Sequence, residues 1–131
     1  MVEFVFEGVK LSFYSAPRTC PKHLREIPFL NNIRLADVES IGIMKLEVML
    51  RRNTFRDYYD IYSILREGYN LRKMIAEAVV HSSYRLKEKN LLMIITNSER
   101  FRKDSHFVHL QPSYNVSPID IQNYITGLLF S

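Results

Sequence analysis

The segment from residue 35 to residue 65 combines charged side chains with apolar, helix-like patterns. Five of its charged residues, which lie within sixteen positions, could together bind an anion or a metal: Lys45, Arg52, Arg56, Asp57 and Asp60. Lysine and arginine are the natural donors to phosphate oxygens. Charged residues are seldom buried without partners, so a lysine among apolar neighbours needs an explanation. These residue types indicate either a phosphate-binding site or a solvated basic face of a helix.

The spacing of the three cations leaves both interpretations open. On one straight helix of about 100° per residue, Lys45, Arg52 and Arg56 fall within about 40° of one another. Such a stripe faces either a shared anion, such as phosphate, or solvent, with the lysine stem lying over apolar neighbours. Asn53-Thr54 breaks the helical pattern, so the second helix can be rotated away from the first.

The two aspartates also have structural alternatives. Thr54-x-x-Asp57 matches a capping box, in which Asp57 serves the N-terminus of a helix. Arg56 and Asp60 are four residues apart and can pair on a helix surface, although this order of charges is the weaker one. Spacing alone therefore does not separate a catalytic role of these aspartates from a structural one.

Hydrophobic periodicity and turn signals predict the elements that position these residues. Val2–Phe6 and Val9–Tyr14 are rich in valine and aromatic residues, and Glu7-Gly8 between them predicts a hairpin turn. A connector with three prolines is expected over Ala16–Asn32. Helices are expected at about residues 36–52, 54–67, 70–82, 84–96 and 117–129.

The predicted fold class is α+β, with an N-terminal β-hairpin packed against a mainly helical C-terminal bundle. We expect a single domain, in which residues 1–34 form the hairpin and the proline-containing connector and residues 35–131 the helical region. The single cysteine, Cys20, excludes an internal disulfide and a four-cysteine zinc site. The start of the chain does not resemble a signal peptide, and no apolar run approaches the ~20 residues that span a membrane. A cytoplasmic protein is expected.

The order of the charged residues resembles the C-terminal signature of the AbiEii/AbiGii-type nucleotidyltransferases. These are toxin components of bacterial abortive-infection systems and belong to the polymerase-β-like superfamily. The matching motifs are Met44-Lys45-Leu46, then Arg52, and then "RDYYDIYSIL", which begins at Arg56. The upstream run "EGVKLSFYSAP" is similar to a strand of the family. The resemblance covers most of residues 8–67, and the helical patterning beyond residue 70 is compatible with it.

The resemblance implies a role for each of the five charged residues. Lys45, Arg52 and Arg56 match positions that contact the nucleotide's phosphates. Asp57 and Asp60 match acids at the catalytic cleft, where Asp60 with Arg56 braces the site. The implied reaction transfers a nucleoside monophosphate from an NTP to an acceptor, in some members the 3′ end of tRNA. Such chemistry requires Mg²⁺ ions bound by carboxylates.

The sequence departs from the family pattern where the metal ligands belong. Complete members carry a Gly-Ser motif followed by an Asp-x-Asp pair, and neither occurs in these 131 residues. On the strand that resembles the family's, Ser12 replaces a third carboxylate, and a hydroxyl does not supply the negative charge that Mg²⁺ prefers. We therefore expect a truncated or degenerate nucleotidyltransferase-like chain, inactive alone and without metal ligands, whereas complete members use Mg²⁺ and NTP.

Two other functions and several partners stay open. The chain is an active Mg²⁺-dependent NTP:RNA nucleotidyltransferase if other carboxylates, such as Glu3, Glu7 and Asp57, bind the metal. It is otherwise a protein-interaction module, similar to an antitoxin. A formal net charge of +4 fits a nucleotide or RNA partner only weakly. The expected protein partners are a chain that supplies the missing N-terminal half, or a second copy bound through an exposed edge strand. No membrane partner is expected.

Overall fold

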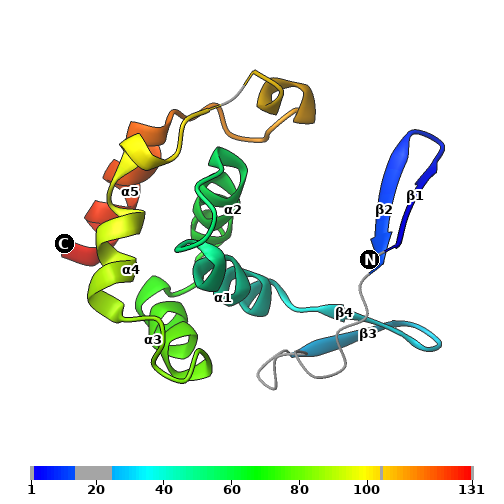
Figure 1. The fold of residues 1–131 in the computed structure, drawn as a ribbon, viewed down its shortest axis with the longest axis horizontal. Helices are drawn as coiled ribbons and strands as arrows, with labels where there is room; N and C mark the ends of the chain where they lie inside the picture. The colour runs from blue at the N-terminus through cyan, green and yellow to red at the C-terminus, as the bar shows by residue number, and fades with distance from the viewer. Residues whose placement is uncertain (1, 14–24, 104, 131) are drawn as a thin grey trace.

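The computed structural model describes residues 2–13, 25–103 and 105–130, and it has two hairpins followed by helices (Figure 1). The hairpins are formed by β1 (Val2–Phe6) with β2 (Val9–Phe13) and by β3 (Glu26–Leu30) with β4 (Ile33–Ala36). The α-helices are α1 (Val38–Val48), α2 (Phe55–Arg66), α3 (Leu71–His81), α4 (Glu88–Ile95) and α5 (Pro118–Phe130). Two short 3₁₀ helices, η1 (Ser98–Arg100) and η2 (Phe107–Leu110), lie between α4 and α5. The predicted α+β class is confirmed.

The first hairpin has one apolar face and one polar face. Its turn residues Glu7 and Gly8 have φ angles of 49° and 80°, as a two-residue turn between twisted strands requires. The strand register gathers apolar side chains on one face: Val2, Phe4, Phe6, Val9, Leu11 and Phe13. On the opposite face Lys10 Nζ lies 3.2 Å from Glu3 Oε1. Side chains therefore alternate between the two faces along the second strand.

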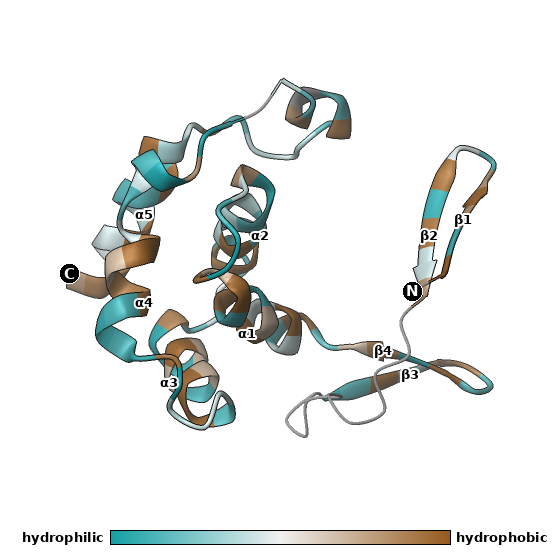
Figure 2. Ribbon diagram, in the orientation of Figure 1, coloured by the Kyte–Doolittle hydropathy of each residue, from teal (hydrophilic) through white to brown (hydrophobic). Residues whose placement is uncertain are grey.

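Both faces of this hairpin are open to solvent. We expected the hairpin to pack against the helices, but every residue of β1 and β2 is exposed, and the hairpin projects away from the helical part (Figure 1). The hydropathy colouring shows apolar residues along both strands (Figure 2). Antiparallel sheets usually bury their apolar face, whereas the apolar face of this hairpin is exposed.

A second hairpin corrects the prediction of a connector at Ala16–Asn32. Strand β3 lies inside that range and pairs with β4, with Ile27 opposite Leu35. Pro28 hid the strand in the sequence, because proline is tolerated only in edge strands, and β3 is one. Residues 14–24, which include Cys20, lie outside the described residues. The base of the hairpin is fixed to α1, because Arg25 Nε donates to Asp37 Oδ2 at 2.9 Å.

Side-chain caps define three of the helix starts. Thr54, Asn70 and Asp37 are N-caps whose side chains accept hydrogen bonds from the backbone three residues later. Helix α5 begins at Pro118, as predicted. In its capping box Ser117 N donates to Asp120 Oδ2 at 2.9 Å, and Asp120 N donates to Ser117 Oγ at 3.3 Å.

Two helix boundaries differ from the prediction. Helix α1 ends at Val48, so Arg52 lies in the turn before α2 rather than on a helix. Helix α4 begins at Glu88 rather than near residue 84, because Ser83 and Tyr84 have φ angles of 55° and 60° and cannot continue a right-handed helix.

The helices bury one apolar core to which the irregular segment before α5 is also attached. The Tyr58 ring stacks on Phe101 at 4.1 Å between centroids, and its hydroxyl donates to the carbonyl of Ile95 at 2.7 Å. Phe107 lies edge-on to Phe55 at 4.7 Å. Large side chains at positions 101 and 107 therefore attach the described parts of the connection between α4 and α5 to α2.

We predict that Phe101→Ala lowers the free energy of unfolding by about 3–5 kcal/mol, because it removes a fully buried ring and leaves a cavity beside Tyr58. Met93→Ala is the control, since Met93 is 62% exposed and its loss changes stability by less than about 0.5 kcal/mol. Urea unfolding followed by circular dichroism measures both. Equal losses in the two variants would contradict the assignment of Phe101 to the core.

Candidate functional site

The structure brings four of the five charged residues together in one network where α1 meets α2. Lys45 Nζ lies 2.8 Å from Asp57 Oδ1 and 2.9 Å from Asp60 Oδ2. Arg52 Nε lies 3.1 Å from Asp57 Oδ2. Arg56 is exposed and makes no ion pair with a residue of the described ranges. Two cations and two carboxylates therefore neutralise one another, and Arg56 stands outside them.

Asp57 is the centre of this network. It occupies the third position of α2, where its backbone N–H donates to Thr54 Oγ1 at 3.4 Å. The Thr54 hydroxyl in turn donates to Asp57 Oδ2 at 2.7 Å. The carboxylate thus accepts from a hydroxyl, an ammonium group and a guanidinium group. The capping interpretation and the charged-site interpretation of Asp57 are compatible, because one carboxylate makes both sets of contacts.

Burial and hydrogen bonding act in opposite directions on the charges of the network. The Asp57 side chain is 1% exposed, and its desolvation alone raises the pKa of the carboxyl. The bonds from Lys45 and Thr54, with the charge of Arg52, outweigh that effect and hold the pKa of Asp57 below its usual range. Partial burial likewise opposes charge on Lys45, yet its bonds to Asp57 and Asp60 raise the pKa of the ammonium group. Both residues are charged at neutral pH.

These contacts correct three details of the sequence interpretation. The helical spacing of the three cations does not apply, because α1 ends at Val48 and Arg52 lies between the two helices. Lys45 does not lie free over an apolar surface: its side chain is 26% exposed and its ammonium group bonds to two carboxylates. Asp60 pairs with Lys45, and the predicted pair of Asp60 with Arg56 does not form among the described residues.

The carboxylates of the network do not fit a Mg²⁺ site. The ammonium group of Lys45 lies between Asp57 and Asp60 and takes one oxygen from each. No group of three or more metal-ligating side chains gathers within the part of the chain that the structure describes. Ser12 lies opposite Glu3 in the exposed first hairpin. A hard divalent ion requires several oxygen ligands. The carboxylate oxygens of Asp57 and Asp60 bond instead to the side chains of Lys45 and Arg52.

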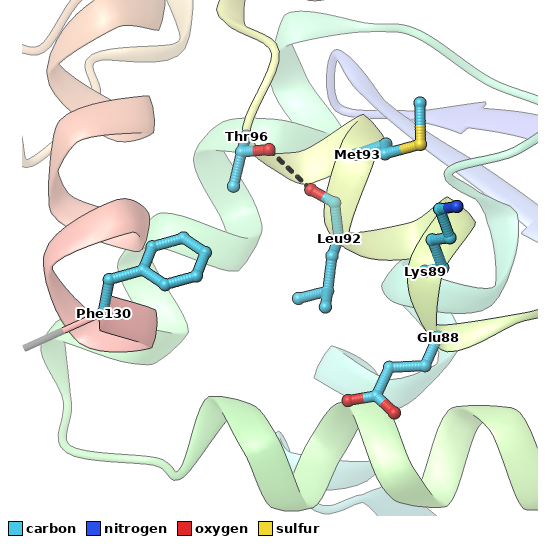
Figure 3. A pocket seen from close by; sticks show the side chains of 6 residues that line it. All are labelled: Glu88, Lys89, Leu92, Met93, Thr96 and Phe130. Carbon is cyan, nitrogen blue, oxygen red and sulfur yellow. Dashed lines mark hydrogen bonds between the residues drawn. The ribbon is translucent and has the colours of Figure 1, made fainter.

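A shallow apolar pocket lies elsewhere, between α4 and the end of α5 (Figure 3). Its volume is about 430 Å³, and Leu92, Met93 and Phe130 form its apolar lining. The Thr96 hydroxyl at its edge donates to the Leu92 carbonyl at 2.6 Å within α4. None of the five charged residues predicted from the sequence lines this pocket.

One cluster was not anticipated from the sequence. The guanidinium group of Arg66 lies 5.9, 5.4 and 5.7 Å from the ring centroids of Tyr62, Tyr114 and Tyr124. Only the four-residue spacing of Tyr62 and Arg66 on one helix face was a visible signal. Cation–π contacts of about 0.5–1 kcal/mol each are typical at exposed sites. The cluster therefore joins α2, the segment after η2 and α5.

Comparison with protein families identifies the class of this chain. The family model described as "Nucleotidyl transferase AbiEii toxin, Type IV TA system" matches residues 2–121. The chain therefore belongs to the AbiEii nucleotidyl transferase toxin family of type IV toxin–antitoxin systems. The match includes both hairpins and extends beyond residue 67 into the start of α5. No curated protein and no solved structure matches the chain. Within the described ranges, no helix has the length and apolar character needed to cross a membrane.

We predict that Asp57→Ala destabilises the fold by about 3 kcal/mol, because it leaves Lys45 and Arg52 without their buried counter-charge. Asp60→Ala is the matched control: it also removes a carboxylate bonded to Lys45, but this one is 38% exposed and costs less than about 1 kcal/mol. Chemical denaturation at pH 7 measures both changes. Equal effects of the two substitutions would refute the central position of Asp57.

A second prediction concerns acid stability. The pKa of the Asp57 carboxyl is lower in the folded protein than in the unfolded chain, where it is about 3.9. The ionised carboxyl therefore stabilises the fold above that unfolded pKa. This contribution disappears as the pH falls through the folded pKa. The free energy of unfolding should therefore fall more steeply below about pH 5 in the wild type than in Asp57→Asn. Urea titrations between about pH 7 and 2.5 measure the difference, and parallel curves would contradict the prediction.

Proposed function

We propose that this chain forms one wall of an AbiEii-type nucleotidyl-transfer site and has no catalytic activity alone. The phosphate-facing wall consists of Lys45, Arg52 and Arg56. The observation that carries the proposal is the buried carboxylate of Asp57, which fixes the head groups of Lys45 and Arg52 next to each other. Side chains that are held in advance lose little freedom on binding, and an ammonium group with a guanidinium fork suits a chain of phosphates.

The two aspartates have different roles in this proposal. Asp57 is a positioning residue, because it is buried and keeps both cations oriented. Asp60 is 38% exposed and bonds to the same Lys45 nitrogen, so it is the partner that a phosphate oxygen of an NTP replaces. Arg56 is exposed one helical turn before Asp60 on α2 and adds a third positive charge. In the transfer, the hydroxyl oxygen of the acceptor bonds to the α-phosphorus and its proton passes to solvent. The bond from the α-phosphorus to the bridging oxygen of the β-phosphate breaks, and pyrophosphate leaves. The three cations offset the charge on the phosphates.

The metal-binding carboxylates come from another polypeptide in this proposal. The described residues of this chain form no cluster of three metal-ligating side chains, and the carboxylates of Asp57 and Asp60 already bond to Lys45. The exposed apolar face of the first hairpin and the free edges of both hairpins support such a partner, since a two-stranded hairpin is only marginally stable alone. We infer that the partner adds strands to these hairpins and carries Gly-Ser and Asp-x-Asp motifs.

The test combines the full chain with Mg²⁺, α-³²P-labelled NTPs and RNA. We expect no label on the RNA with the chain alone, and transfer after addition of the N-terminal region of a complete family member. Lys45→Gln should lower the restored rate by at least tenfold, corresponding to about 1.4 kcal/mol or more of transition-state stabilisation. Lys89→Gln, at an exposed cation on α4, should leave the rate unchanged.

The other functions predict different results in the same experiment. Label transfer by the chain alone would support an active enzyme with carboxylates from its own hairpins. Failure to bind NTP, together with a stable complex with a neighbouring protein, would support an interaction module. Light scattering that gives twice the chain mass would show that a second copy, rather than a different polypeptide, covers the hairpins. Each of these results would overturn the corresponding part of the proposal.

A further inference from the structure

A second basic site lies where the C-terminal ends of α1 and α3 meet. An open depression of about 630 Å³ is lined there by Glu47, Arg51, His81, Ser83 and Arg85, among others. The volume lies within the range of about 300–1,000 Å³ that small-molecule sites occupy in proteins. The family resemblance assigns none of these residues a role. The depression therefore requires an explanation of its own.

The charges in this depression favour an anion. Arg51 and Arg85 come from separate segments of the chain, and both are exposed. Neither guanidinium group lies in a close salt bridge given for the described residues, although the charge of Arg51 acts on Glu47 in the same depression. Glu47 contributes the only carboxylate among the lining residues. Two planar forks at one depression match the oxygens of a phosphate group, and the single carboxylate leaves an excess of positive charge.

The backbone that carries Ser83 and Arg85 into the depression is strained. Ser83 and Tyr84 are consecutive left-handed residues, and neither is a glycine. Their N–H groups donate to Val80 and Val79 at 3.0 Å each, which ends α3 and turns the chain sharply. Left-handed conformations cost L-residues roughly 1–2 kcal/mol each, and such strain concentrates at binding and catalytic sites. The turn brings Ser83 and Arg85 into the same lining as Glu47 and Arg51.

This depression is separate from the network of Lys45 and Asp57. Glu47 follows Lys45 by two residues on α1, so the two side chains point about 200° apart around the helix. None of the residues that bond to Asp57 lines the depression. A ligand here therefore contacts the opposite side of α1 from the phosphate-facing wall.

We propose that this depression binds a phosphate monoester, with Arg51 and Arg85 on the phosphate oxygens and Glu47 hydrogen-bonded to a hydroxyl of the ligand. A hydroxyl-bearing ester is favoured over free phosphate for two reasons. The depression is much larger than one phosphate group. Its carboxylate also repels a bare anion but can bond to the hydroxyl of an organic group. Burial raises the pKa of Glu47, as is common for titratable groups in binding sites.

The test follows the backbone amide signals of the full chain by NMR during titration with ribose 5-phosphate, inorganic phosphate or ribose. We expect ribose 5-phosphate to shift the amides of Ser83 and Arg85, with a dissociation constant at least tenfold lower than that of inorganic phosphate. Ribose alone should shift neither amide. If inorganic phosphate binds as tightly as the ester, the assignment of a monoester is wrong.

Substitutions separate this site from general attraction to a basic protein. Arg51→Gln and Arg85→Gln should each weaken ribose 5-phosphate binding about tenfold. Lys89→Gln removes the same charge at another exposed position and should change binding less than about twofold. Glu47→Gln should tighten inorganic phosphate, because it removes the repelling carboxylate. Equal effects of the three cation substitutions, or shifts centred on Lys45 and Arg52, would overturn the proposal. Circular dichroism of each variant checks that it is folded.

Discussion

The buried carboxylate of Asp57 determines how the first two helices and their turn are arranged. A charged group that is 1% exposed is stable only with several partners, and Asp57 receives bonds from Lys45, Arg52 and Thr54. These partners come from α1, from the turn and from the N-cap of α2. The requirement to satisfy one buried charge therefore ties three consecutive segments together.

The helices and the hairpins differ in how much of their apolar surface they bury. The helices share one core, in which aromatic side chains from the irregular segment before α5 also take part. Each hairpin, in contrast, exposes its apolar residues, including Phe4, Phe13 and Phe29. The six apolar side chains on one face of the first hairpin contain no charge, so binding of an apolar partner there brings no like charges together. The helical part therefore has a core of its own, whereas no described residue of either hairpin is fully buried.

The sequence predicted what depends on neighbouring residues and missed what depends on distant ones. The cap at Thr54 and the helix starts near residues 70 and 117 were predicted correctly, because a capping side chain and its target are three residues apart. The end of α1 was misplaced because its apolar pattern continues to Leu50. Strand β3 was missed because Pro28 resembles a connector signal. The bond of Lys45 to Asp57 spans twelve residues and two helices, so spacing on one helix did not reveal it.

The difference in burial between Asp57 and Asp60 decides which of them can exchange its partner. Removing Lys45 from Asp57 leaves a desolvated carboxylate, which costs several kcal/mol in typical proteins. Removing it from Asp60 exposes a carboxylate that water already reaches, and ion pairs of that kind contribute at most about 1 kcal/mol. In the proposed role, an incoming phosphate therefore replaces Asp60 and leaves the Asp57 contact intact. The lysine keeps its position through the exchange, and the charge of Asp60 is released to solvent beside the bound phosphate.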